Sequence, residues 1–451
     1  MACHGTFRVG FLKGSARALP LSRRSRGFPA QAKYYQVKIP RGLPQGFLYK
    51  EVIGMGSKIL GGTLLIVGTS LGAGMLALPL VTAGGGYFHS LWLFFGMWLV
   101  TVFAAFLLLE VNLWFPERSN LISMARDTLG VPGQIVTWLS YLLLLYSLLA
   151  AYIAGGSDLL QGLFSLMHFS TPLWLDSVIF TLLLGAIVFN DILFVDWANR
   201  GLMTIKMLAY VILIALITPH VHFKNLAYGH FKLLSSAVMV VVTAFGYSVI
   251  IPSLRTYFNS NVKALRITIA LGSLLALMCY LAWDFVVQGS LASAGAGGLV
   301  RMAISGHATS DLTAALSTQL HSTEIAKAAR VFTTVCVTTS FLGVALCLTD
   351  FLADGMQVRK VGMSRWLVML VTFGPPLAVI ILYPAGFILG LRYAGVFCVI
   401  LLILTPMLMT YSGRYVKKIA SGYRVWGGWP VLSFSLIVAF VLLVYGVVHV
   451  F

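Results

Sequence analysis

Long runs of apolar residues, separated by short polar or glycine- and proline-containing segments, fill the chain from about residue 59 to its end. A helix needs about twenty apolar residues to cross the roughly 30 Å hydrocarbon core of a bilayer. The runs reach that length repeatedly, so the pattern predicts an all-α polytopic membrane protein with eleven transmembrane helices. We expect these spans at residues 59–84, 88–115, 134–156, 174–195, 198–218, 236–257, 263–290, 325–349, 365–383, 385–411 and 431–450.

The composition agrees with this pattern and excludes several classes of protein. Of the 451 residues, 59% are hydrophobic and 10% are charged, whereas a soluble chain carries about 25% charged residues. A soluble enzyme and a single-span receptor with a large globular domain are therefore excluded. The five cysteines form no spaced pairs, and His220, His222 and His230 are an incomplete ligand set at weak spacing. We expect neither a metal site nor a cofactor.

A basic arm precedes the first span. Residues 1–54 contain ten of the 31 Lys and Arg beside a single acid, Glu51, and so carry +9 of the formal +18. Four prolines and the lack of a helical period predict a disordered, dispensable extension, which an upstream start codon would explain. An organellar transit peptide, which is also rich in arginine and poor in acids, is the alternative. We do not expect the arm to bind nucleic acid.

Basic residues also predict the orientation of the spans. With the N-terminus in the cytoplasm, the inner loops and adjoining helix ends hold fourteen Lys and Arg and the outer ones hold five. Cytoplasmic loops carry such an excess. Eleven spans then place the C-terminus outside, and the long loop at about 291–324 is external. We expect a short surface helix in this loop, at residues 311–316.

Two of the predicted spans contain interruptions at corresponding places. The first carries residues 68–75 (GTSLGAGM) before Pro79, and the sixth carries residues 243–248 (TAFGYS) before Pro252. Because glycine and proline weaken a helix, we expect helices 1 and 6 to be discontinuous. Their separation is that of a five-plus-five inverted repeat followed by one additional helix. The two repeats and the additional helix would occupy residues 59–218, 236–411 and 431–450.

Breaks in a membrane helix survive beside a cavity or in buried protein, because hydrocarbon cannot satisfy the freed N–H and C=O groups. The N-terminus of a half-helix presents partial positive charge to a carboxylate, and free carbonyls can hold an ammonium group. An amino acid zwitterion suits both ends. The alternative is close helix packing through the glycines, but two breaks at corresponding positions favour a ligand site.

Several segments carry a resemblance to a known family. They are residues 68–79 (GTSLGAGMLALP), 107–111 (LLLEV), 151–154 (AYIA), 339–345 (TSFLGVA), 350–354 (DFLAD), 393–396 (YAGV) and 422–428 (GYRVWGG). On these segments the chain resembles the aromatic amino acid permeases of bacteria, the tyrosine- and tryptophan-specific branch of the hydroxy and aromatic amino acid permease family. The resemblance runs from about Lys58 to the end, nearly 90% of the chain, and we expect residues 55–451 to be the transporter domain. It implies the LeuT-type fold and proton-driven uptake across the bacterial inner membrane.

The resemblance also implies a set of substrate-binding residues at the two breaks. We expect the substrate carboxylate at the backbone N–H groups around the second half of helix 1, and the substrate ring near aromatic side chains. In the sixth span this sequence has Ser248 and Val249 where relatives carry His and Gly, which puts the substrate identity in question. The expected substrate-binding residues are Thr69, Gly72, Ala73, Gly74, Tyr152, Phe245, Gly246, Tyr247 and Ser248.

The resemblance further points to residues for proton coupling. In this fold the fifth helix passes the first break, so Lys206 would lie near the hydroxyl groups of Thr339 and Ser340. A buried lysine that loses and regains its proton could replace a coupling ion. The alternative is a lysine that extends to the cytoplasmic surface. Glu110, near the inner end of the second span, is a further coupling candidate, with a solvated carboxylate as its alternative.

These features favour a proton-coupled symporter of an aromatic amino acid, tyrosine first, with a tryptophan or a serine/threonine permease of the same family as alternatives. A membrane redox subunit would need histidine pairs or carboxylate and cysteine clusters inside the spans, and the sequence has no such set. The expected partners are the amino acid, the proton and the lipid bilayer. The sequence leaves the oligomeric state open.

Overall fold

The computed structural model describes residues 45–451, and their side chains from Gly56 onward. Within this part the undescribed residues are Arg118, Ser170, Asp191, Tyr228, Ala296, His321, Arg359, Val361 and Ala385, together with the side chains of Leu166 and residues 190–200. Predictions for residues 1–44 lie outside this part. Residues 45–54, which we expected in the disordered arm, are helical, because the helix begins directly after Pro44, the last of the four prolines.

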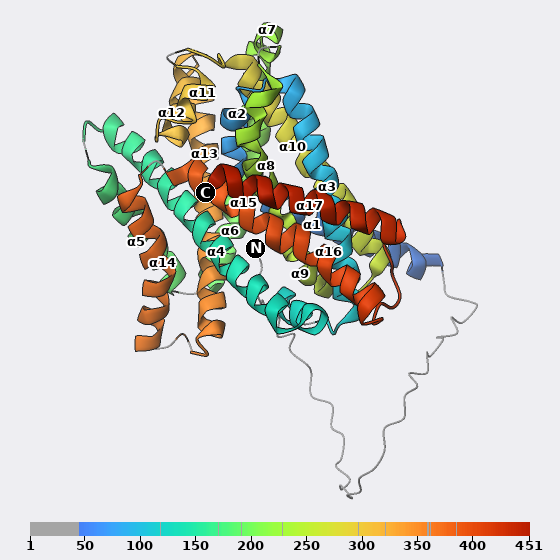
Figure 1. Cartoon of the computed structure of the whole chain (residues 1–451). Helices are drawn as coiled ribbons and strands as arrows, with labels where there is room; N and C mark the ends of the chain where they lie inside the picture. The colour runs from blue at the N-terminus through green and yellow to red at the C-terminus, as the bar shows by residue number, and fades with distance from the viewer. Residues whose placement is uncertain are drawn as a thin grey trace, which may run out of the picture. The chain divides into compact units, whose positions relative to one another are not determined.

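The described part of the chain is all helical (Figure 1). The longer helices are α1 (Gln45–Ser70), α2 (Ala73–Thr82), α3 (Tyr87–Trp114), α4 (Leu121–Leu166), α5 (Leu173–Asn190), α6 (Ile192–Ile217), α10 (Val262–Ser290), α12 (Ala308–Thr318), α13 (Thr323–Gly355), α14 (Met363–Leu382), α15 (Gly386–Cys398) and α17 (Gly428–Val450). Shorter helical segments are η1 (Thr218–His220), α7 (Phe223–Leu226), η2 (Phe231–Ala237), α8 (Val238–Ala244), η3 (Gly246–Ile250), α9 (Ile251–Tyr257), α11 (Leu299–Met302), η4 (Val399–Leu404), α16 (Thr405–Tyr411) and η5 (Ser412–Val416).

Nine helical segments of the described residues are long and apolar enough to cross a membrane, and the bent pair α1 and α2 makes a tenth. The shorter apolar helix Leu173–Phe189 coincides with the fourth predicted span. It ends at Phe189, six residues before the predicted boundary at residue 195. The short helix predicted at residues 311–316 is confirmed as part of α12.

The third span differs most from its prediction. Helix α4 begins at Leu121, where Asn120 accepts a hydrogen bond from the Ser123 N–H and Ser123 in turn accepts from the Asn120 N–H. This reciprocal cap fixes the helix start. Gly130, with φ 78° and ψ −167°, then breaks the helix and turns its direction, a backbone conformation that only glycine adopts readily. A short helix therefore precedes the span, which continues beyond residue 156 to Leu166.

Both predicted interruptions are present. Helix α1 ends at Ser70 and α2 begins at Ala73, with a bend of 57° between them. Helix α8 ends at Ala244, and a tighter 3₁₀ segment, η3, leads into α9. At the first break a side chain on Gly72 would meet the Ser340 hydroxyl at 2.6 Å. The glycine therefore permits a close approach of α13, which positions the break.

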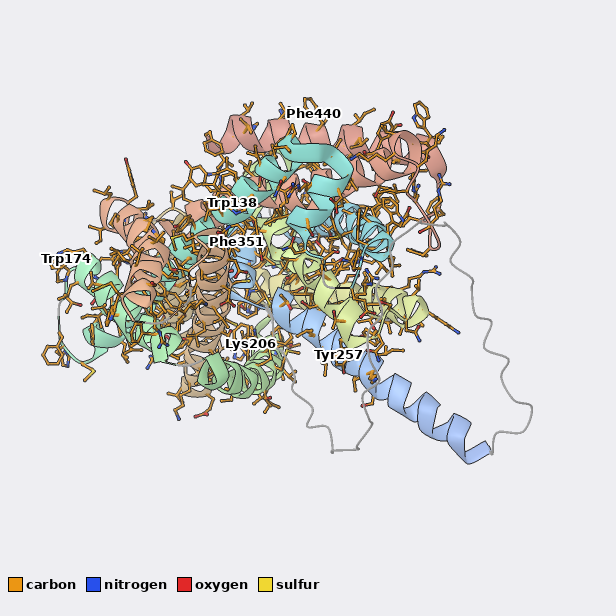
Figure 2. The ribbon with its side chains drawn as sticks, turned by 90° about the horizontal axis from the view of Figure 1, so that it is seen from below. Trp138, Trp174, Lys206, Tyr257, Phe351 and Phe440 are labelled. Carbon is orange, nitrogen blue, oxygen red and sulfur yellow. The ribbon has the colours of Figure 1, made fainter. Side chains whose placement is uncertain are left out.

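The helices pack into one compact unit over Lys58–Phe451. Helix α13 lies against α6 and α4, α15 lies against α4 and α8, and α17 runs along α15 and α16 (Figure 1). Trp174 and Phe440 are 53% and 60% exposed and point outward, whereas Lys206 lies among the helices at 2% exposure (Figure 2). Exposed apolar side chains on this scale are expected where a surface faces lipid.

Candidate functional site

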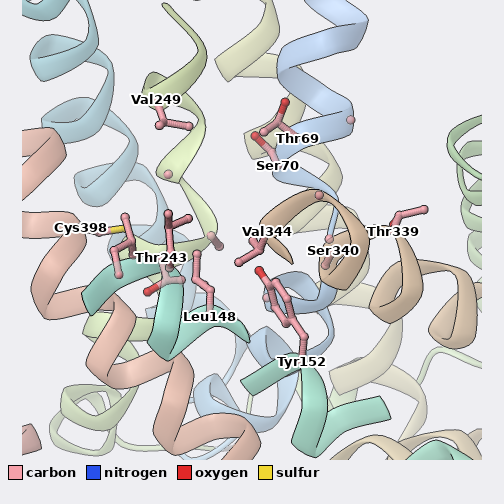
Figure 3. Close-up of a pocket in the computed structure, with 18 of the residues that line it drawn as sticks. Thr69, Ser70, Leu148, Tyr152, Thr243, Val249, Thr339, Ser340, Val344 and Cys398 are labelled. Atoms are coloured by element: carbon pink, nitrogen blue, oxygen red, sulfur yellow. The ribbon is translucent and has the colours of Figure 1, made fainter. Parts of the chain in front are cut away.

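A cavity lies between the two helix breaks. It contains about 920 Å³ of space outside protein atoms, including its open mouth. Figure 3 shows Ser70 on one side of this space and Thr243 on the other, with the ring of Tyr152 pointing into it. The wall is formed by Gly68, Thr69, Ser70, Gly72, Gly74, Tyr141, Leu144, Leu145, Leu148, Tyr152, Met203, Lys206, Thr243, Ala244, Gly246, Val249, Thr339, Ser340, Gly343, Val344, Cys398 and Leu402.

The structure brings most of the predicted site residues together. Eight of them line the cavity, and Ala73 contacts it through the hydroxyl of Ser340. Four others, Phe245, Tyr247, Ser248 and Glu110, are not among the described lining residues. The eight that line it are Thr69, Gly72, Gly74, Tyr152, Lys206, Gly246, Thr339 and Ser340.

Backbone groups at the first break already have partners. The N–H of Gly72 donates to the Ser70 carbonyl at 2.9 Å, and the N–H of Ala73 donates to Ser340 Oγ at 2.9 Å. Two of the donors that we expected to meet a carboxylate are therefore used within the protein in this conformation. Ser70 Oγ, in contrast, is buried and has no hydrogen-bond partner among the described residues. A buried polar atom without a partner is costly, so this hydroxyl is available to a ligand.

Lys206 is buried beside the first break. Its Nζ donates to the Gly68 carbonyl at 3.2 Å and lies 3.5 Å from Thr339 Oγ1, which itself donates to the Val335 carbonyl at 2.8 Å. Gly68 is two residues before Ser70, the end of the first half-helix, where carbonyls lack intrahelical donors. The ammonium group therefore faces the break. The alternative of a side chain extended to the surface is wrong, because the residue is only 2% exposed.

One side of the cavity is apolar. Leu148 of α4, Val344 of α13, and Cys398 and Leu402 at the junction of α15 with η4 form this part of the wall. Segment η4 is π-helical, a rare turn that is frequent at functional sites. These positions gave no motif in the sequence, since single apolar residues inside a span cannot be told from lipid-facing ones. The unpartnered Ser70, in contrast, lies within the glycine-rich segment that marked the break.

The aromatic side chains of the second break point away from the cavity, contrary to the expectation that they would meet a ring there. Phe245 is 1% exposed and packs edge-to-face against Tyr280 of α10, with ring centroids 5.1 Å apart. Tyr247 is equally buried. The tighter 3₁₀ winding of η3 rotates successive side chains by 120° instead of 100°, which changes the direction of each of them.

Glu110 lies in a buried ion pair outside the cavity. Its two carboxylate oxygens accept from Arg414 Nε at 2.7 Å and Nη2 at 2.5 Å, and the Val425 N–H donates to the same group at 2.7 Å. Both side chains are at most 1% exposed, so the solvated alternative is wrong. The pair joins α3, η5 and the 422–428 loop. Such bidentate geometry suits a fixed structural contact.

A second polar cluster lies near the C-terminal end of α4, at Asp158. The carboxylate of Asp158 accepts from the backbone N–H and the hydroxyl of both Thr309 and Ser310, at 2.6 to 3.0 Å. His307 Nδ1 lies 3.1 Å from the same carboxylate, and this hydrogen bond raises the pKa of His307 above its usual 6.5. The cluster therefore fixes the start of α12 against α4.

Comparisons with known proteins agree with this arrangement. Residues 55–448 match the tryptophan/tyrosine permease family. The Tyrosine-specific transport system 1 of Haemophilus influenzae is 33% identical over 392 residues, which cover 86% of this chain and 94% of that protein. Glutamine transporter 2 of Aliivibrio fischeri is 31% identical over 399 residues, covering 86% and 99%.

The fold is that of LeuT-type transporters. A mutant of the manganese transporter of Eremococcus coleocola aligns with a TM-score of 0.60 at 13% identity, over 90% of this chain and 88% of that one. The expected resemblance is thus confirmed by both sequence and fold. This multi-pass membrane chain belongs to the tryptophan/tyrosine permease family, whose members are transporters and not enzymes.

Proposed function

We propose that the protein is a proton-coupled symporter that carries an aromatic amino acid, tyrosine, into a bacterial cell by alternating access. The proposal includes eleven spans in a five-plus-five inverted repeat, in the inner membrane, with the N-terminus cytoplasmic and the C-terminus periplasmic. The family match and the cavity between two helix breaks support it. The observation that carries it is the position of this cavity, because broken membrane helices place charged helix ends at a substrate site.

The zwitterion of the substrate would be held at the first break. Its carboxylate would bind at the N-terminus of α2, where backbone N–H groups carry partial positive charge, and where Ser70 Oγ has no partner. The Ala73 N–H, now donating to Ser340 Oγ, would turn to the carboxylate or share its proton. Binding would thus draw α2 and α13 into a new arrangement, as alternating access requires.

The substrate ring would lie against the apolar wall. Leu148, Val344, Cys398 and Leu402 offer apolar contact, and the hydroxyl of Tyr152 adds a polar group at its edge, a combination that suits tyrosine. The ring would therefore contact α4, α13 and the η4 turn. Phe245 and Tyr247 would support the break from behind instead of contacting the ring.

The cavity extends from the breaks toward one side of the membrane. Its wall includes Gly68 of α1, Val249 of η3 and Gly343 of α13, whereas α2 beyond Gly74 is buried in protein. With a cytoplasmic N-terminus, these lining residues belong to the inner half. The structure would thus correspond to the inward-facing state, in which substrate leaves and Lys206 exchanges its proton with the cell interior.

There are two reasons to consider substrates other than tyrosine. Ser248 and Val249 replace the His and Gly expected in relatives, and one relative is a glutamine transporter at 31% identity. Glutamine is therefore a further candidate beside tryptophan, serine and threonine. Its side-chain amide would use the hydroxyl groups of Tyr152 and Thr243 in place of ring contacts.

Counterflow in proteoliposomes tests the proposal. Vesicles loaded with unlabelled tyrosine should take up labelled tyrosine, while excess unlabelled tryptophan or phenylalanine competes and glutamine or serine does not. An inward proton gradient should drive tyrosine uptake against its concentration gradient. Protein-free vesicles are the control. Stronger competition by glutamine than by tyrosine would show that glutamine is the preferred substrate. Equal uptake with and without the proton gradient would contradict proton coupling.

A further inference from the structure

A tyrosine of α10 connects the two helix breaks. Tyr280 has no exposed surface, and its hydroxyl lies 2.8 Å from the Ser70 carbonyl and 2.6 Å from the Ala244 carbonyl. Ser70 is the last residue of α1 and Ala244 is the last residue of α8. One hydroxyl group therefore meets the C-terminal ends of both half-helices, which come from parts of the chain 174 residues apart.

The two carbonyls differ in their other partners: the Ser70 carbonyl also accepts from the Gly72 N–H at 2.9 Å, whereas the Tyr280 hydroxyl is the side-chain donor that both of them share. The last carbonyls of a helix have no intrahelical partner, and they carry the partial negative charge of the helix end. Two such ends facing one another repel, so a donor placed between them stabilises their close approach. The hydroxyl of Tyr280 supplies a shared proton at the point where they converge.

The position of Tyr280 is fixed by its surroundings. Its ring packs edge-to-face against Phe245, the residue directly after Ala244, at 70° between ring planes. Such pairs hold a preferred geometry, so the hydroxyl cannot easily turn away from the breaks. This packing also accounts for the direction of Phe245, which turns toward α10 and away from the cavity.

We infer that Tyr280 is a positioning residue for transport: its hydroxyl holds the two half-helix ends at one separation, so that a substrate meets both breaks in register. This inference rests on the proposed function and adds a residue to it. Tyr280 is not among the described lining residues, and it acts through the carbonyls of Ser70 and Ala244. Lys206 covers the Gly68 carbonyl in the same break with a charge that can be lost, whereas Tyr280 provides a permanent neutral link.

Removal of the hydroxyl alone tests the inference. Tyr280→Phe keeps the ring contact with Phe245 but leaves both carbonyls without this donor. The matched control is Tyr210→Phe, because the Tyr210 hydroxyl donates to one backbone carbonyl, that of Cys279, at 2.9 Å, and neither residue is among the described cavity-lining residues. Tyrosine binding to purified protein should weaken about tenfold or more in Tyr280→Phe and less than about twofold in the control.

A rescue variant separates positioning from folding. Tyr280→4-aminophenylalanine, introduced by amber suppression, has two N–H protons for the two carbonyls and should restore the affinity to within about twofold of the unaltered protein. The midpoint temperature of thermal unfolding in detergent, measured alongside, should fall by similar amounts in Tyr280→Phe and Tyr210→Phe. If Tyr280→Phe cannot be purified, the 4-aminophenylalanine variant alone decides, and a tenfold loss of affinity in it overturns the inference.

The other outcomes are equally decisive. Unchanged affinity in Tyr280→Phe, or an equal loss in Tyr210→Phe, overturns the positioning role. Failure of the unaltered protein to bind any of the labelled amino acids would instead remove the proposed function. The two failures are therefore distinguishable in one set of measurements.

Discussion

Replacing Lys206 by glutamine removes a positive charge from the wall of the cavity but keeps an N–H donor there. Lys206 Nζ donates to the Gly68 carbonyl at 3.2 Å. A glutamine amide is shorter and reaches the carbonyl only after a small shift of α6 toward α1. Lys206→Met would in addition leave the carbonyl without a donor, at a cost of about 1–3 kcal/mol. The two variants therefore separate the charge from the hydrogen bond.

The size of the coupling effect follows from the proton gradient. One pH unit corresponds to about 1.4 kcal/mol per proton, so one proton carried with each substrate supports about tenfold accumulation. A transporter without its exchangeable proton equilibrates its substrate and reaches a ratio of about one. Exchange of labelled for unlabelled substrate needs no net proton movement. We expect it to stay within about threefold in Lys206→Gln, since the Gly68 carbonyl keeps a donor.

The assay compares two measurements on the same proteoliposomes. Lys206→Gln should retain counterflow and lose accumulation under a gradient of one pH unit, inside alkaline. Lys327→Gln is the matched control, because Lys327 is 73% exposed, pairs with Glu324 at 3.0 Å and is not among the described cavity-lining residues. About tenfold accumulation by Lys206→Gln would refute the reasoning, and equal loss of counterflow and accumulation would assign the lysine to substrate binding.

Further substitutions test other contacts. Gly72→Ala places a methyl group 2.6 Å from Ser340 Oγ, so equilibrium binding should show affinity lowered at least about tenfold, with unaltered affinity as the contrary result. Glu110→Gln leaves its buried arginine partner uncompensated and should destabilise the fold by about 3–5 kcal/mol in unfolding titrations; an unchanged midpoint would contradict this. The pKa of His307 is raised by Asp158, so its stabilisation is present below about pH 6.5 and is lost as pH rises through the raised pKa. The midpoint temperatures of thermal unfolding at pH 6 and at pH 8 should therefore lie closer together in His307→Gln than in the unaltered protein.

Local features of the sequence were sufficient to predict the helix breaks. Three glycines within residues 68–75 and the TAFGYS segment weaken the helix wherever the spans pack, so both interruptions could be placed without knowledge of the fold. The end of the fourth span was placed too late, because Asp191 and Asp196 both offer a polar stop within a few residues. The choice between two such stops depends on how the following helix packs.

Partners and directions of side chains could not be predicted in the same way. The resemblance placed Lys206 near the first break, but not its contact with the Gly68 carbonyl. The prediction that Phe245 and Tyr247 line the cavity was wrong. Their directions depend on whether η3 winds as a 3₁₀ or an α-helix, and packing determines which of the two forms. Tyr280 gave no signal, since a tyrosine inside an apolar run is ordinary. Its role depends on two carbonyls that become close only after folding.

The buried contact between Glu110 and Arg414 also has a consequence for synthesis of the protein, because its two residues are made at different times. The two residues are 304 positions apart, and a ribosome adds about 5–20 residues per second, so the carboxylate is synthesised about 15–60 s before its partner. During that interval it must stay at the hydrated edge of the membrane, since an isolated buried charge is unstable. A nascent chain that stops short of Arg414 keeps that unpaired group permanently. Although the residues from Arg414 onward provide none of the described cavity-lining residues, they supply the partners of the Glu110 carboxylate, so the packing around α3 is complete only after this segment has been made.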